Sequence, residues 1–68
     1  EIGDRTSEAI TRYNIAMIHR DEGDLDEAIR ELEIVVDLDR QMDHPDLASD
    51  TAMLEQLRQE REKTRKAK

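Results

Sequence analysis

Apolar side chains recur at steps of three and four along most of the chain, which is the spacing of one face of an α-helix. The first such segment predicts a helix over residues 6–22, with apolar positions around more than half of its girth. The next two segments predict helices over residues 24–39 and 45–65, the last with a narrower apolar stripe. A helix that is apolar over so broad a face packs on two sides, which favours a stacked array of helices.

Glycines mark the expected breaks. Gly3 suits the left-handed conformation that closes a helix, so we expect a preceding helix to end within residues 1–4 and a new one to start after it. Gly23 ends the first predicted helix. Asp24, followed by Glu27 three residues later, has the spacing of a capping box at the start of the second helix.

A loop as short as the one at Gly23 makes the helices that it joins antiparallel neighbours. We expect Ala28 to lie where these two helices approach most closely. The second break is the polar connector 40–44, after which Pro45 suits the first turn of the third helix because its missing N–H costs no hydrogen bond there. The side chains expected to hold the hairpin together are Ile15, Ala16, Ala28, Ile29, Leu32 and Val35.

The third helix repeats the pattern of the first when the chain is shifted by 39 residues. Repetition of this kind is typical of helical arrays. The prediction is therefore an all-α fold with one domain over residues 1–68, in which an antiparallel hairpin is followed by a C-terminal capping helix. The matched pairs are Asp4 with Asp43, Ala9 with Ala48, Ile15 with Leu54 and Ile18 with Leu57.

Composition narrows the class of protein. The chain has 68 residues, which is enough for one domain, and 35% of them are hydrophobic while 43% are charged. It contains no Cys, so disulfides and thiolate metal sites are excluded, and this usage fits a cytoplasmic protein. No apolar run approaches the roughly 20 residues that span a bilayer, so we expect no membrane partner.

Charge is distributed unevenly. Residues 1–57 carry a net charge of −11 and should repel a phosphate backbone, whereas residues 58–68 carry +4. We interpret residues 58–68 as the solvent-exposed end of a helix, where cations lie near the negative end of the helix dipole. No aromatic side chain lies among these cations to stack on a base, so we expect no nucleic-acid partner.

No set of side chains indicates catalysis or metal binding. The chain has no Cys and its Ser residues fall at helix starts, so no nucleophile is paired with a base. His19 and His44 lie on separate segments without ligand spacing. The acidic residues around Gly23 lack the ligand order of an EF-hand loop. We therefore expect no enzymatic activity, no cofactor and no metal.

Residues 9–42 resemble one tetratricopeptide repeat, without a gap. Ile15-Ala16 resembles the Leu-Gly/Ala pair of that family, Gly23 resembles its inter-helix glycine, and residues 24–28 (DLDEA) resemble its G-D-Y-x-E-A-I run. The connector is similar to the longer repeats of kinesin light chains and of bacterial regulators with such arrays. The chain departs from the family at Arg12, His19 and Arg40, where Trp, Tyr and Pro are favoured.

The resemblance implies an α-solenoid fragment that serves as a protein–protein interaction scaffold. From this resemblance we expect it to bind a peptide or a neighbouring domain in the groove between its first and third helices, with Tyr13 as an anchor and Asn14 pairing with the main chain of the ligand. Arg20 is the one cation on this groove, so the family's clamp for acidic tails is not supported, and the acidic body favours a basic segment. The expected peptide-binding residues are Tyr13, Asn14, Met17, Arg20, Asp21, Ser49, Ala52, Gln56 and Gln59.

Two other functions stay open. A piece of a repeat array leaves apolar faces uncovered, so the first alternative is a structural module that forms a homo-oligomer at high concentration through residues such as Ile10 and Ile18. The weaker alternative is a J-domain-like co-chaperone, because residues 44–46 form the His-Pro-Asp tripeptide of those domains. In J-domains the helix before the tripeptide is basic, whereas here it is acidic.

Overall fold

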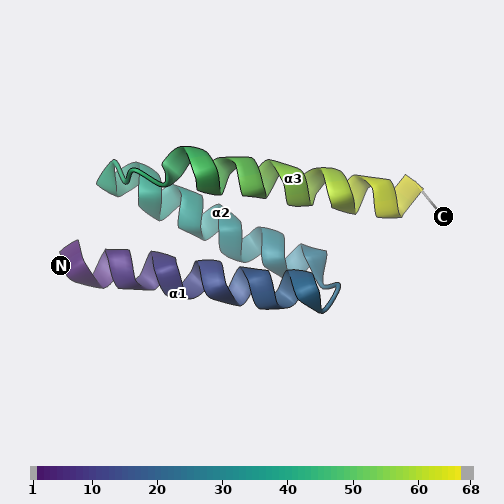
Figure 1. The fold of residues 1–68 in the computed structure, drawn as a ribbon, viewed down its shortest axis with the longest axis horizontal. Coiled ribbons are helices and arrows are strands. Elements are labelled where there is room, and N and C mark those ends of the chain that lie inside the picture. Colours follow the sequence, from purple (N-terminus) through teal and green to yellow (C-terminus); the bar gives the residue numbers. More distant parts are fainter. Residues whose placement is uncertain (1, 67–68) are drawn as a thin grey trace.

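A computed structural model describes residues 2–66, and the side chains of residues 5–64, as three helices. Helix α1 spans Ile2–Asp21, α2 spans Leu25–Met42 and α3 spans Leu47–Lys66. The first and third helices run in the same direction, and α2 runs back between them and packs against both (Figure 1). The predicted all-α fold, with an antiparallel hairpin and a third helix, is confirmed.

The turn between α1 and α2 is closed by backbone hydrogen bonds around Gly23. Its N–H donates to the carbonyl of Arg20 at 3.0 Å, and the N–H of Asp24 donates to the carbonyl of His19 at 2.8 Å. This is a Schellman motif, which places Gly23 in the left-handed region with φ of 83°. Gly23 therefore ends the helix as predicted.

The expected capping box at Asp24 is wrong. Asp24 is the residue before α2, but its side chain makes no capping hydrogen bond. Its backbone, with φ of −93° and ψ of 72°, lies outside the extended conformation that capping residues usually adopt. The carboxylate lies instead 3.9 Å from Nδ1 of His19, on the preceding helix.

The turn between α2 and α3 has the same hydrogen-bond pattern but uses Asp43 where the first turn uses glycine. The N–H of His44 donates to the carbonyl of Asp39 at 2.9 Å, and Asp43 has a φ of 52°. Residues 40–42 belong to α2, so the connector is shorter than the predicted 40–44, because the helix continues until this left-handed residue closes it. Pro45 lies in a turn just before α3 and not inside the helix.

The start of α1 also differs from the prediction. The helix already includes Ile2 and Gly3, so no earlier helix ends within the described part of residues 1–4, and α1 begins four residues before the predicted position 6. A single glycine inside a helix costs only about 1 kcal/mol relative to alanine, which the rest of a 20-residue helix outweighs.

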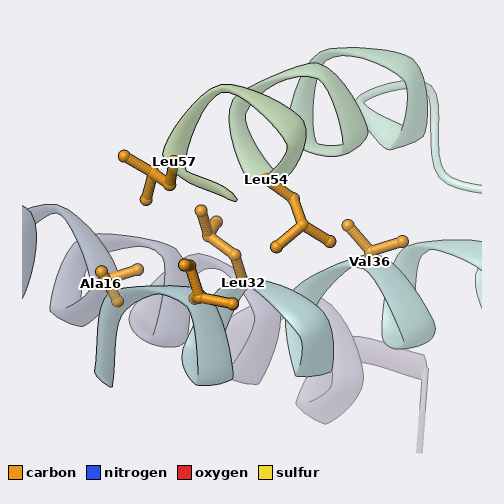
Figure 2. Packing of buried hydrophobic residues seen from close by; sticks show 7 residues of the cluster. Ala16, Leu32, Val36, Leu54 and Leu57 are labelled. Carbon is orange, nitrogen blue, oxygen red and sulfur yellow. The ribbon is translucent and has the colours of Figure 1, made fainter. Parts of the chain in front are cut away.

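The core lies along α2 and is covered from both sides. Ala16 of α1 and Leu54 and Leu57 of α3 meet the side chains of Leu32 and Val36 (Figure 2). Five of the six side chains predicted to hold the hairpin are buried: Ala16, Ala28, Ile29, Leu32 and Val35.

The sixth, Ile15, is 37% exposed, so its assignment to the hairpin core is wrong. Neighbouring residues of a helix point about 100° apart, and Ala16 is the one that faces α2.

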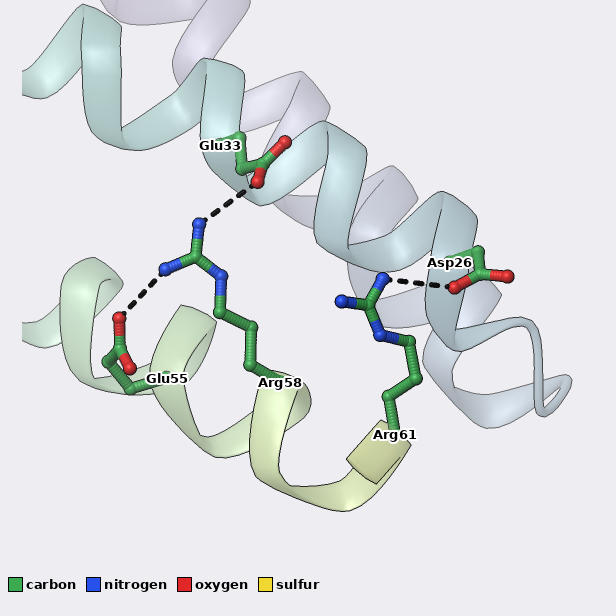
Figure 3. Close-up of polar contacts among 5 residues, drawn as sticks. All are labelled: Asp26, Glu33, Glu55, Arg58 and Arg61. Carbon is green, nitrogen blue, oxygen red and sulfur yellow. Dashed lines mark hydrogen bonds and ion pairs between the residues drawn. The ribbon is translucent and has the colours of Figure 1, made fainter. Parts of the chain in front are cut away.

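Arginine side chains join α2 to its neighbours through ion pairs. Arg58 of α3 lies 2.9 Å from Glu33 of α2 and 2.9 Å from Glu55 of its own helix, and Arg61 lies 3.1 Å from Asp26 (Figure 3). The start of the basic segment 58–68 is therefore tied to α2 by surface ion pairs, in which the side chains of Arg58 and Arg61 are still 41% and 35% exposed. The exposed stretch begins at residue 62 and includes residues 62–64.

Arg12 joins α1 to α2 in the same way. Its guanidinium lies 2.9 Å from Glu8 on α1 and 2.9 Å from Glu31 on α2. The hydrogen bonds to Glu8 and Glu31 raise the pKa of Arg12. Arg12 thus provides a polar link between the two helices of the hairpin.

Candidate functional site

A cavity of about 330 Å³ opens between α1 and the start of α3. The side chains that α1 contributes to the lining are mainly apolar and include one amide. Those from α2, the connector and α3 are mainly carboxylates. Its lining residues are Ala9, Ile10, Tyr13, Asn14, Asp39, His44, Asp46, Ser49 and Asp50.

Three of the residues predicted for peptide binding line this cavity: Tyr13, Asn14 and Ser49. Tyr13 is half-buried and packs against the hydrophobic core, while Asn14 and Ser49 are exposed. The arrangement offers a fixed aromatic surface next to an amide and a hydroxyl. Side chains from α1 and α3, far apart in sequence, are therefore available to one ligand.

Three further predicted residues lie in the last turns of α1, outside the cavity. Met17 packs partly against the core. Arg20 lies with Nη1 at 4.0 Å from the sulfur of Met53 and Nη2 at 3.4 Å from Asp21. The guanidinium of Arg20 thus already has neighbours on α1 and α3, and Asp21 itself is exposed.

The remaining predicted residues belong to α3 and are exposed without lining the cavity: Ala52, Gln56 and Gln59. Gln56 donates a hydrogen bond to Glu60 at 3.3 Å on the same helix. A ligand that reached these side chains would have to extend well beyond the cavity along α3.

Sequence reasoning missed the acidic residues of the site, above all Asp39 and Asp50. A signal for Asp39 was present, because it lies three and four residues after Val36 and Val35 and so continues the apolar stripe of α2. A carboxylate on the buried face of a helix is unusual and indicates that another group is paired with it. Asp50 carried no such signal, since its contact with Asp39 depends on how the connector places α3.

These two carboxyl groups form the electrostatic centre of the cavity. Asp39 is only 1% exposed, and its Oδ2 atom has no hydrogen-bond partner. Burial, a hydrogen bond to Asp39 and the negative charges of Asp39 and Asp46 together raise the pKa of Asp50 to about 7. Near neutral pH the pair therefore holds a proton for part of the time, since two adjacent carboxylates resist ionising together.

His44 takes part in the local structure of this end of the molecule. Its Nδ1 accepts a hydrogen bond from the backbone N–H of Asp46 at 3.0 Å, within the tripeptide that precedes α3. Among the described residues, no three His, Asp or Glu side chains are placed so that they could hold a metal ion. No helix in the described part has the length and apolar character needed to cross a membrane.

Comparison with protein-family models, with curated proteins and with solved structures gave no match for this chain.

Proposed function

We propose that this chain is a protein–protein interaction module of the tetratricopeptide type, which binds a peptide segment in the groove between α1 and α3. The observation that carries the proposal is the cavity lined by both helices, with Tyr13, Asn14 and Ser49 on its walls. Tyr13 offers a large contact area with few torsions to immobilise, and these properties make tyrosine a frequent anchor in interfaces.

The charge of the groove favours a basic partner. Asp39, Asp46 and Asp50 line the cavity, and no Lys or Arg is among its lining residues. An acidic cavity on an acidic body accelerates association with a cationic segment, and more so at low salt. Because two helices and one cavity offer a small area, we expect affinities of roughly micromolar or weaker.

A titration with a library of capped basic peptides, followed by amide NMR shifts, tests this function. We expect the shifts to cluster around Tyr13, Asn14 and Ser49, and we expect Tyr13→Ala and Asn14→Ala to weaken binding. Gln41→Ala is the matched control, since it removes a side-chain amide from an exposed position on α2. The proposal fails if the shifts cluster on residues 25–37 of α2 or on residues 58–64, away from the cavity, or if the two groove variants bind as the wild type does.

A second candidate function, self-association, is favoured by the uncovered isoleucines. Ile10 and Ile18 of α1 are 57% and 56% exposed, and Ile15 and Ile34 are also exposed. Apolar groups on one face of a helix are stabilised when another helix covers them. Sedimentation should then show a dimer or larger species at millimolar concentration that Ile18→Lys disperses, while Ala52→Lys on α3 does not. A monomer of 8.0 kDa at that concentration would count against this candidate.

A further inference from the structure

Asp39 is a buried carboxylate that lacks a permanent partner. It lies on the apolar stripe of α2, is 1% exposed and lines the cavity, yet no donor of the described residues reaches its Oδ2 atom. Burying a charge without a counter-charge or a hydrogen bond is costly, so such groups are normally paired. Among the described residues, a proton on Asp50 can satisfy Asp39, and because Asp39 lines the cavity, a donor that enters from outside the chain can take the place of that proton.

The groups around Asp39 are acceptors or neutral on every element that lines the cavity. α1 contributes Tyr13 and Asn14, and the connector contributes Asp46 and His44, whose Nδ1 is already an acceptor for a backbone N–H. α3 contributes Asp50 together with the hydroxyl of Ser49. The cavity thus gathers three carboxyl groups and has no cationic side chain among its lining residues.

We propose that this cavity binds the ammonium group of a lysine side chain from the peptide segment that lies in the groove. This inference rests on the proposed function of the groove. Lysine fits better than arginine because the ammonium is a compact charge with three donors at the end of a flexible stem, whereas the guanidinium is a planar fork. For these three donors the cavity lining offers oxygen acceptors on Asp39, Asp50, Asp46 and Asn14.

A proton on Asp50 can stabilise Asp39 when no ammonium group is bound. When Asp50 is protonated it donates a hydrogen bond to Asp39, which satisfies the buried carboxylate, and its pKa of about 7 makes this proton exchangeable near neutrality. Binding of an ammonium group favours the ionised pair and releases the proton. The affinity for a lysine peptide should therefore rise as the pH increases from 6 to 8, by at most tenfold per pH unit for one proton.

The test uses the full chain and a capped alanine peptide with one central lysine, followed by amide NMR shifts. We expect shifts at Asp39, Ser49 and Asp50 that are lost when the lysine is acetylated, because acetylation removes the charge. Asp39→Asn should weaken binding at least tenfold. Asp37→Asn is the matched control, since it removes an exposed carboxylate two residues away on α2 and should leave binding within twofold.

The Asp39→Asn variant also separates a binding role from a structural one. An asparagine amide can donate to Asp50 and removes one of two adjacent negative charges, so the variant should fold and melt at or above the wild-type temperature at pH 8. A clear loss of thermal stability in Asp39→Asn would show that the carboxylate supports the fold, and would overturn the inference. Unchanged lysine binding in this variant, or affinity that falls as the pH rises, would overturn it as well.

Two further titrations distinguish the lysine site from peptide binding in the groove. n-Butylammonium carries the lysine ammonium without a peptide, so shifts at the cavity with this amine, but none with any peptide, would support the cation site and contradict peptide binding. Peptides that shift Tyr13 and Asn14 equally with lysine, arginine or alanine at the centre would support the groove function and overturn the lysine site.

Discussion

α1 and α3 carry two matched pairs of large apolar side chains 39 residues apart, and in these pairs only the α3 members are covered. Leu54 and Leu57 rest on α2 and are buried, whereas Ile15 and Ile18, their counterparts on α1, are exposed. The difference comes from the neighbours, because α3 has α2 along this face and α1 has no described helix there. Helical periodicity identifies which face of a helix is apolar, but an additional element decides whether that face is a core or a surface.

The largest effect should come from removing a covered side chain of this matched set. Leu57→Ala should lower the free energy of unfolding by about 2–5 kcal/mol, because it leaves a cavity where α3 packs on α2. Ile18→Ala at the matched position should change it by less than about 0.5 kcal/mol, as exposed substitutions usually do. Urea denaturation followed by circular dichroism measures both. Equal losses in the two variants would mean that Ile18 is also covered in solution.

The next effect concerns the contact between α1 and α2. Ala28 is fully buried in the hairpin, so Ala28→Leu should force the helices apart and cost ~1–3 kcal/mol. Ala52→Leu adds the same atoms at an exposed position of α3 and should leave the midpoint nearly unchanged. A wild-type melting temperature for Ala28→Leu would place the closest approach of the helices elsewhere.

The sequence contained most of what determines the fold. The periodicity of three and four, the glycine at position 23 and the short loop were sufficient for the three helices and the antiparallel hairpin. Each depends on interactions between residues close in sequence. Ile15 was misassigned because it and Ala16 are adjacent apolar residues, and only the packing of α2 decides which of them faces inward.

The candidate site was less predictable because it depends on contacts between distant residues. Tyr13, Asn14 and Ser49 were expected in one groove from the family resemblance, and the structure brings them to one cavity. Asp50 was missed, since its proximity to Asp39 requires the path of the connector. That path depends on a left-handed Asp43, and aspartate in this conformation is too uncommon to predict from sequence.

A smaller effect should distinguish the two turns. Gly23→Ala should cost about 1–2 kcal/mol, since a left-handed alanine is strained although an added Cβ at this position meets no atom within 4 Å. Asp43→Gly relieves the same strain in the other turn and should stabilise the protein by up to about 1 kcal/mol. The higher conformational entropy that glycine gives the unfolded chain reduces this gain. Thermal melts should therefore shift in opposite directions. A loss of stability in Asp43→Gly would indicate that the aspartate side chain itself holds the turn.

The smallest effect should be a change of the melting temperature with pH. It concerns a position at which α1 and α3 differ in charge. Asp50 of α3 corresponds to Thr11 of α1, and its pKa is raised from 3.8 to about 7. The folded state then binds a proton that the unfolded chain releases, so this contribution to stability is fully present below about pH 4 and is lost as the pH rises through 7. Because Asp50 is partly open to solvent, water screens this contribution, and we expect it to be smaller than that of the turn substitutions.

Melting temperatures measured from pH 5 to pH 8 should therefore fall with rising pH in the wild type. Asp50→Thr makes α3 resemble α1 at this position and should flatten the slope. Tyr13, Asp39, His44 and Asp46 also line the cavity, so Asp37→Asn, which leaves all of them in place, serves as the control and should retain the wild-type slope. A slope that persists in Asp50→Thr would assign the titration to another of these groups, and stability that rises with pH would contradict proton sharing between Asp39 and Asp50.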